Sequence, residues 1–452
     1  MRLKKRRLKC TGKFQISRKV NKSSFEVLGS PIFEEGVHGM FSAKIESVEL
    51  LSKRLQLLDV HPALCIFKSS LSAPRFNYLL RTCKSFLVPE LLDRVDEMFR
   101  STLEMITNTK LDVISWKQAS LPLSFGGLGI RKSSDLAYPA YLSSVHQSSK
   151  LSNAILSKFG LNLLNEDISL ILETLPPEFS LLDDESKVIQ KEWDLIGVQK
   201  AFDEMLTSGS PADRARLLAS STKESSKWLQ VIPSSKLGLL LDNNTTRIAV
   251  ALRLGCQICE EHRCICGKVV DRFGHHGLSC KNSKGWIPGH NDLNNIFSHA
   301  FSSAGIPNIL QPPGISRDDG KRPDGMTLIP WSRGKLLLWD VTVRDTLAQS
   351  YLSISSSKAG SIADQAELKK HNHYVKLKKN HLFKPIAFES LGSCGQETKN
   401  FLVSLGKLMK KASGESKSLD YLLQKVSISL QRRNAACILG TFEKRLDDFY
   451  LL

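Results

Sequence analysis

Long hydrophobic runs are missing from this sequence. No stretch of about 18 consecutive apolar residues occurs, and the basic start is not followed by the apolar core of a signal peptide. We therefore expect neither membrane insertion nor secretion, and a nuclear or cytoplasmic location. Repeats of a fixed period and long low-complexity segments are missing too, which excludes solenoid architectures.

Acidic residues are in deficit. The sequence has 63 lysines and arginines against 45 aspartates and glutamates, which gives a formal net charge of +18. Such an excess favours a polyanionic partner, DNA or RNA, although an over-charged soluble surface would give the same count. The basic cluster at 4–7 could serve nuclear import, bind phosphates, or do neither.

The first half of the chain has a helical pattern. Apolar residues recur at three- and four-residue spacing over 42–59, 76–88, 91–107 and 137–206, the last with a break at Pro176–Pro177. A serine-rich patch at 207–226 then indicates a boundary or a mobile connection, so we place a domain break between about 207 and 243.

Three glycines interrupt the helical pattern between Leu121 and Arg131. The segment reads Leu-Pro-Leu-Ser-Phe-Gly-Gly-Leu-Gly-Ile-Arg, as expected of a tight turn in which the backbone approaches something closely. From spacing alone, a structural turn is the favoured interpretation.

The pattern changes after a short helix at 245–254 and a cluster of cysteines. We expect helices at 291–304, 362–377 and 397–411, with strands at 326–329, 336–343 and 385–388. Helices that alternate with strands around an apolar central strand are typical of a small mixed sheet flanked by helices.

Five of the ten cysteines lie between residues 256 and 280. Such crowding in a basic chain fits reduced metal-binding thiols better than disulfides. Cys264, Cys266, His276 and Cys280 supply three thiolates and an imidazole, the ligand set of a structural tetrahedral zinc site. The spacing alone leaves other ligands open. These are Cys256 and Cys259, which form a C-x-x-C pair and are the leading substitutes, and the nearby His262, His275 and His290.

Two aspartates stand where strands are expected. Asp324 opens one strand, and Asp340 lies inside an apolar strand, where a charge is costly unless it is paired or bound to metal. Carboxylates on adjacent strands can share Mg²⁺ or Mn²⁺ and leave coordination positions for a phosphate oxygen and an attacking water. A nuclease of this type also uses a lysine, for which Lys369 and Lys370 are candidates. In isolation, an ordinary turn and a salt bridge would explain both aspartates.

A series of motifs completes this region. In order along the chain they are C-x-C-G, H-x-x-x-C, His290-Asn, Arg322-Pro-Asp-Gly, Trp-Asp-Val-Thr-Val, Glu367-x-x-Lys-x-x-x-Tyr and Phe388-Glu-Ser-Leu-Gly. The series resembles the endonuclease domain of non-LTR (LINE-type) retrotransposons that carry a restriction-like PD-(D/E)XK nuclease. Upstream, the segments at 28–32, 72–75 and 116–129 resemble the end of a reverse transcriptase palm and its thumb. The resemblance covers about residues 25–395.

The resemblance implies cleavage of target DNA that primes reverse transcription. It implies that Asp324 and Asp340 bind the catalytic metal, that Lys370 is a migrated catalytic lysine, and that Glu389 joins or supports the site. The expected nucleic-acid contacts are His290, Arg322 and Lys369. The expected partner is target DNA, with the element's RNA as a further candidate, and with no membrane and no small-molecule cofactor.

Three positions depart from the pattern of the family. Thr342 stands two residues after Asp340, where the usual motif has its lysine. Gln311 stands where a carboxylate often precedes the Pro-Gly, and Gly289 precedes His290 where arginine is common.

Polymerase chemistry needs an Asp-Asp pair that is flanked by hydrophobic residues and lies on a hairpin. The sequence has three Asp-Asp pairs, at 183–184, 318–319 and 447–448, and none has that setting. We therefore expect no reverse transcriptase activity.

The expected architecture is multidomain: an α-helical thumb-like region, a CCHC zinc segment and an α/β restriction-endonuclease-like domain. The expected parts are a basic disordered tail (1–24), a palm remnant with a helical thumb-like region (25–145), a helical connector (146–243), the zinc-binding segment (244–289), the endonuclease domain (290–415) and C-terminal helices (416–452). The alternative is a nucleic-acid-binding relic, or a co-opted retroelement fragment, without catalysis.

Overall fold

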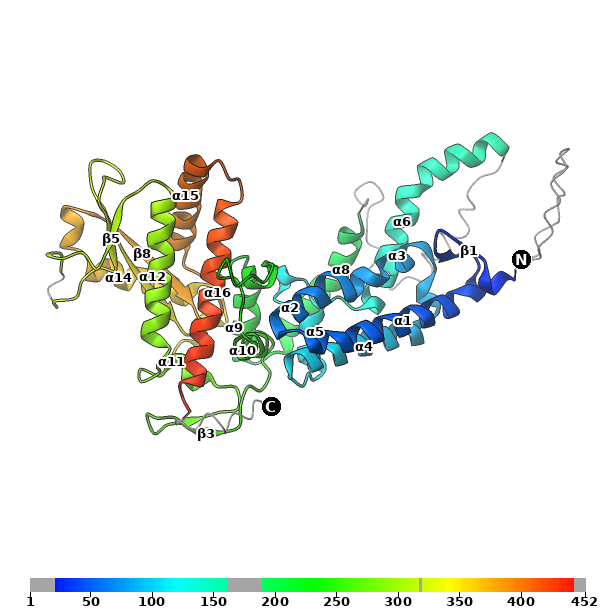
Figure 1. Cartoon of the computed structure of the whole chain (residues 1–452), viewed down its shortest axis with the longest axis horizontal. Coiled ribbons are helices and arrows are strands. Elements are labelled where there is room, and N and C mark those ends of the chain that lie inside the picture. Colours follow the sequence, from blue (N-terminus) through cyan, green and yellow to red (C-terminus); the bar gives the residue numbers. More distant parts are fainter. Residues whose placement is uncertain (1–20, 161–188, 317–318, 443–452) are drawn as a thin grey trace.

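The computed structural model describes residues 21–160, 189–316 and 319–442. Figure 1 shows an elongated molecule, with the first helices at one end and a sheet with its covering helices at the other. The described part is mostly helical and contains one small mixed sheet. None of its helices combines the length and apolarity that crossing a membrane requires. Most of the expected basic tail, and the expected break at Pro176–Pro177, lie outside the described residues.

Two short strands open the described chain. β1 (Glu26–Val27) and β2 (Ser30–Pro31) pair antiparallel across Leu28 and Gly29. Both turn residues have a positive φ, 53° and 77°, which suits the twist of a two-residue hairpin. The hairpin leaves the side chain of Leu28 90% exposed.

The helices expected over 42–59, 76–88 and 91–107 are present with shifted ends. The stretch expected over 137–206 is helical on both sides of residues 161–188, which lie outside the described part. This part of the chain contains α1 (Val37–Arg54), α2 (Val60–Ile66), α3 (Ala73–Thr82), α4 (Pro89–Thr107), α5 (Val113–Ser120), α6 (Ser133–Leu156) and α8 (Gln190–Ser208). In α4 a proline occupies the first turn, and the buried Leu91, Val95, Phe99 and Leu103 form one stripe at four-residue spacing. The stripe packs with Phe67 and Phe76 in the core of this half.

The serine-rich stretch is a packed part of the helical half, contrary to the expected mobile connection. Ser210 caps α9 (Pro211–Ser220) by accepting a hydrogen bond from the Asp213 backbone N–H. Ser225 is fully buried, and a short 3₁₀ helix, η9 (Lys227–Gln230), places Trp228 in the main core. This core includes residues before, within and after 207–243. The expected domain break therefore falls inside one continuous hydrophobic core.

Arg253 anchors the glycine-rich turn to α10 (Asn243–Leu254). Its buried guanidinium donates hydrogen bonds to the carbonyls of Gly127 (3.0 Å) and Ser220 (2.9 Å). A side chain at Gly127 would begin 1.9 Å from the Leu121 carbonyl oxygen, so only glycine fits. The turn therefore joins α5 and α6 to α9 and α10.

A four-stranded sheet forms the other end of the molecule. Its strands are ordered β5 (Asn308–Leu310), β6 (Gly325–Thr327), β7 (Leu337–Arg344) and β8 (Leu382–Glu389). The first two pairings are antiparallel, and β7 pairs parallel with β8. Covering helices are α12 (Trp286–Ser303), α14 (Ser361–His373) and α15 (Gln396–Ser413), whereas the short α13 (Leu352–Ser355) packs on α9 and α14. The mixed sheet expected from the sequence is confirmed, with β5 as an additional strand.

The C-terminal region is a single described helix, α16 (Ser418–Leu439), which stands between the two ends of the molecule (Figure 1). It contacts α12 and α15 on the sheet side, and α10 and η9 on the helical side. Its Leu422 and Val426 enter the core beside the sheet, whereas Ile428 and Ile438 enter the helical core. This helix therefore joins both ends of the molecule instead of forming a separate unit.

Candidate active site and metal centre

The cysteine cluster is built by a short hairpin and one helical turn. β3 (His262–Arg263) pairs with β4 (Val269–Val270), and the tight turn between them carries Cys264 and Cys266. The second pair of ligands comes from α11 (His275–Ser279), which carries His276 and is followed directly by Cys280.

The four ligand atoms of Cys264, Cys266, His276 and Cys280 lie within 4.8 Å of one another. The Cys264 and Cys280 Sγ atoms are 3.7 Å apart, close to the roughly 3.8 Å expected for two thiolates on one tetrahedral zinc. The Cys266 Sγ lies 3.1 Å from His276 Nε2. This cluster could hold a zinc ion, and it is the ligand set preferred from the sequence.

The alternative zinc ligands lie outside this cluster. The Cys259 thiol faces the Asp271 carbonyl at 3.6 Å, and Cys256 lies in the main hydrophobic core. His262 stacks on Phe442. The remaining candidates also have other partners, His275 with Asp271 and His290 with Asp324.

Asp324 lies directly before β6 and Asp340 lies on the neighbouring β7, so the two strands bring them together as expected. The Asp324 backbone N–H donates to the Trp339 carbonyl (3.0 Å). The next residue, Gly325, has to be glycine because a Cβ there would lie 2.0 Å from the Trp339 indole. The Pro-Asp-Gly segment thus leads into a strand, which fixes the position of Asp324.

Lys370 and Tyr374 converge on the Asp340 carboxylate. The Lys370 Nζ lies 2.6 Å from Oδ1, and the Tyr374 hydroxyl donates to Oδ2 at 2.5 Å. Asp340 itself is only 5% exposed. Burial raises the pKa of the Asp340 carboxyl and the nearby Asp324 adds to the rise, whereas Lys370 and Tyr374 oppose it.

The Asp324 carboxylate is held by two other groups. Its Oδ2 accepts a hydrogen bond from the Val341 backbone N–H (2.6 Å), and its Oδ1 lies 3.0 Å from His290 Nε2. The hydrogen bond to Asp324 raises the pKa of His290, and burial opposes that rise. The backbone contact to Val341 ties the Asp324 side chain to β7 next to Asp340.

These groups open into one cavity of about 480 Å³. It is lined by His290, Gln311, Gly320, Lys321, Arg322, Pro323, Asp324, Asp340, Lys370 and Tyr374. The two carboxylates are thus accompanied by three lysine or arginine side chains, a combination that suits both a cation and an anionic substrate.

The sequence left Lys369 and Lys370 as alternatives, and the structure separates them. Lys370 points to Asp340, whereas Lys369 is exposed and does not line the cavity. Of the expected nucleic-acid contacts, His290 and Arg322 line the cavity.

The structure does not bring Glu389 into this group. In β8 it pairs with Arg344, four residues beyond Asp340 on β7, so it lies towards the far end of the strands. Its carboxylate is fully buried, accepts hydrogen bonds from the Ile362 and Ala363 backbone N–H groups, and thereby caps α14. The expected catalytic role of Glu389 is therefore replaced by a structural one.

Tyr374 is the site residue to which the sequence analysis assigned no role. It follows Lys370 by four positions, so both residues lie on one face of the α14 end, and this spacing was the available signal. Gln311, one of the departures from the family pattern, lines the cavity with φ at 48°.

Gly289, another departure from the family pattern, has a packing explanation. A Cβ at this position would lie 2.5 Å from the side chain of Arg433 on α16. An arginine side chain from another helix thus occupies the space beside Gly289.

No protein-family model matches the sequence, and no curated protein matches it.

Proposed function

We propose that this chain is a retroelement-derived, metal-dependent DNA endonuclease of the restriction-like type. In this proposal it nicks target DNA in the nucleus or cytoplasm, and the thumb-like half and the zinc segment hold the DNA through phosphate contacts. The observation that carries the proposal is the convergence of Asp324, Asp340 and Lys370 in one cation-rimmed cavity. The chain would have no polymerase active site.

Asp324 and Asp340 would hold Mg²⁺ or Mn²⁺. The donor set fits a hard cation, because it consists of carboxylate oxygens, each of which keeps a further lone pair beyond its present hydrogen bond. The carboxylate of the buried Asp340 beside that of the half-buried Asp324 also favours a bound cation. Such an ion would supply Lewis-acid polarisation of a phosphodiester oxygen.

The remaining side chains have separate roles in the proposal. The Lys370 ammonium would orient the attacking water and neutralise charge that develops on the phosphate. Tyr374 and His290 would hold the two carboxylates in position. Lys321 and Arg322 at the rim, and the exposed Lys369, would contact backbone phosphates of the substrate.

The test is nicking of supercoiled plasmid by purified protein with Mg²⁺ or Mn²⁺. We expect wild-type protein to convert the plasmid to the open-circular form, and Asp324→Asn and Asp340→Asn to lose this activity by at least about 100-fold. Asp93→Asn, an exposed position on α4, is the matched control and should cleave like wild type. Undiminished activity in both site variants would refute the assignment.

A binding-only relic is the second candidate. Both oxygens of Asp340 already have partners within 2.6 Å, a closed arrangement that would persist without a cation. This candidate predicts a salt-sensitive affinity for DNA and no cleavage with any divalent metal. Wild-type nicking that disappears in Asp324→Asn would exclude it.

A further inference from the structure

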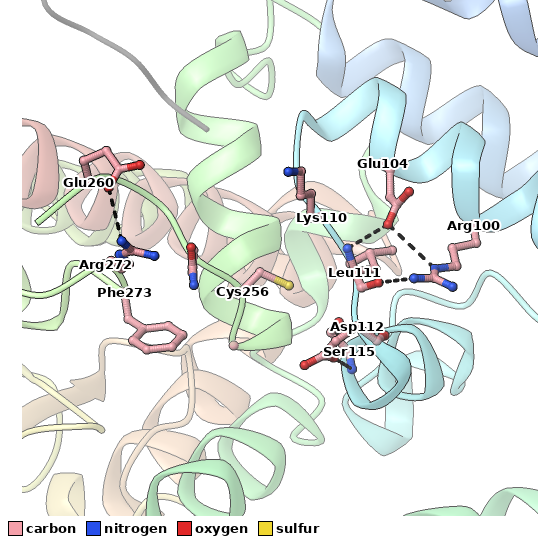
Figure 2. Close-up of a pocket in the computed structure, with 12 residues that line it drawn as sticks. Arg100, Glu104, Lys110, Leu111, Asp112, Ser115, Cys256, Glu260, Arg272 and Phe273 are labelled. Carbon is pink, nitrogen blue, oxygen red and sulfur yellow. Dashed lines mark hydrogen bonds and ion pairs between the residues drawn. The ribbon is translucent and has the colours of Figure 1, made fainter.

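A second cavity, separate from the carboxylate pair, lies between the helical half and the zinc segment. It measures about 840 Å³, within the usual range for ligand sites. Figure 2 shows two walls. One comes from the end of α4 and the start of α5, and the other from Cys256, Glu260, Arg272 and Phe273. Arg272 and Phe273 stand just before the zinc-site helix α11.

The charges of the α4–α5 wall are engaged within the wall. Arg100 donates to the Leu111 carbonyl oxygen and pairs with Glu104, and the Glu104 carboxylate accepts from the Leu111 backbone N–H (2.8 Å). Asp112 caps α5 by accepting from the Ser115 backbone N–H (2.7 Å). These charged groups pair with one another or with the backbone of the same wall, so they leave little charge for a ligand.

Other lining groups remain available. Within the described part of the chain, the Lys110 ammonium and the Gln257 amide make no hydrogen bond or ion pair, and both residues are exposed. Arg272 pairs with Glu260 only at 3.8 Å, and both side chains are more than half exposed, so a ligand can compete for the guanidinium. Phe273 is 39% exposed; its ring stacks with His275 (centroids 5.6 Å apart) and projects towards the space between the walls (Figure 2).

We propose that this cavity binds an unpaired nucleotide of a single-stranded nucleic acid. The base would stack on Phe273, the adjoining phosphates would contact Lys110 and Arg272, and the Gln257 amide would reach a base edge. Sequence-tolerant single-strand sites combine these elements, an aromatic face and nearby cations. Stacking on Phe273 requires an accessible base face, which a base inside a duplex does not offer, so the site favours an unpaired strand. The inference rests on the nucleic-acid partner of the proposed function but not on hydrolysis.

The test uses a short single-stranded oligonucleotide with one 2-aminopurine, titrated with the protein in the absence of divalent metal. Stacking on Phe273 should quench the fluorescence of the 2-aminopurine. We expect Phe273→Ala to abolish the quenching and to weaken binding roughly 5- to 100-fold, whereas Phe273→Tyr should retain both. Lys110→Ala should weaken binding and reduce the salt dependence by about 0.7 in the log–log slope.

Tyr421→Ala, at a 47% exposed aromatic on α16, is the control and should bind like wild type. Unchanged quenching and affinity in Phe273→Ala would overturn the inference. DNA and RNA versions of the oligonucleotide show which strand the cavity prefers. The titration measures binding without cleavage, so it tests this inference even if the protein is not a nuclease. If the wild type nicks plasmid but Phe273→Ala binds the oligonucleotide as tightly as the wild type, only this inference is overturned. Equal thermal stability of all variants excludes misfolding as the cause.

Discussion

Two neighbouring lysines on α14 have different surroundings. The Lys370 ammonium contacts Asp340 inside the cavity, whereas Lys369 is exposed outside it. Both residues carry the same charge and lie on the same helix. Substituting each in turn therefore separates a catalytic contribution to the nicking rate from a general electrostatic contribution.

We expect Lys370→Ala to reduce the nicking rate by about 100-fold or more, because it removes a preorganised positive charge next to the reacting phosphate. Lys369→Ala should reduce it only a few-fold, through weaker phosphate binding that added salt also weakens. Initial rates of plasmid nicking at saturating Mg²⁺ measure both. Equal losses in the two variants would contradict the assignment of Lys370.

The sequence predicted part of the candidate site at this scale. Asp340 could be identified because a charge in an apolar strand has to be compensated. Glu389 was misassigned because a carboxylate that caps a helix and one that binds a metal look alike in sequence. Glu367, to which the sequence analysis gave no role, is a second buried carboxylate of this kind, since it accepts from the Thr398 backbone N–H at 2.8 Å near the start of α15. Only the packing of α14 against β8 and α15 distinguishes these roles.

At the scale of elements, α2 is tied to the loop before α10 by a buried histidine. His61 is 3% exposed, and its Nδ1 accepts a hydrogen bond from the Leu241 backbone N–H (3.1 Å). Burial lowers the pKa of His61 to about 4. Protonation would place a charge in the core and break this hydrogen bond.

The depressed pKa of His61 predicts a loss of stability in acid. Its contribution is fully present above about pH 6.5, the unfolded value, and is lost as the pH falls towards 4. At pH 5 the free energy of unfolding should be about 2 kcal/mol lower than at neutral pH, relative to His61→Asn, which keeps an acceptor but does not titrate. Urea unfolding at pH 7.5, 6 and 5 measures the difference. Parallel curves for the two proteins would contradict the prediction.

The packing of α12 against α16 depends on a glycine. A Cβ at Gly285 would lie 2.5 Å from the Cys437 backbone nitrogen, so the helices would have to separate. We expect Gly285→Ala to lower the free energy of unfolding by about 1–3 kcal/mol. Gly197→Ala, in α8 with open space around the new Cβ, should raise it by about 0.5–1 kcal/mol. Urea unfolding of both variants tests this, and a neutral Gly285→Ala would mean that α16 is not held this closely.

The strongly periodic helices and the long apolar strands were predictable, but the short and polar elements were not. β5 has three residues and no fully buried side chain, so its pattern is too weak to see. The serine-rich stretch was misinterpreted because its burial depends on a residue distant in sequence. Arg253 donates hydrogen bonds to the Ser220 carbonyl and to the Ser226 hydroxyl. Local composition carries no information on such a contact.

At the scale of the whole molecule, the cysteine cluster is joined to the rest of the fold. Leu278 of α11 lies in the main core, and α11 packs on α16. Loss of zinc should therefore destabilise more than the hairpin that carries Cys264 and Cys266.

We expect the purified protein to contain one zinc per chain. Cys280→Ser should lose the metal and lower the Tm by about 5–10 °C, whereas Cys259→Ser should keep it, because that thiol lies outside the cluster. Metal analysis and thermal unfolding, with and without a chelator, measure both effects. A full zinc content in Cys280→Ser would contradict the ligand assignment.

The position of α16 has a consequence for how the protein is made. This helix follows in sequence every element that it covers, including α10, α12 and α15. On the ribosome, the apolar surfaces that α16 later covers, one on the sheet side and one on the helical side, therefore stay exposed until α16 has left the exit tunnel. Both ends of the molecule then complete their cores after the sheet and its helices have been synthesised, and during that interval the chain is open to chaperones and to aggregation.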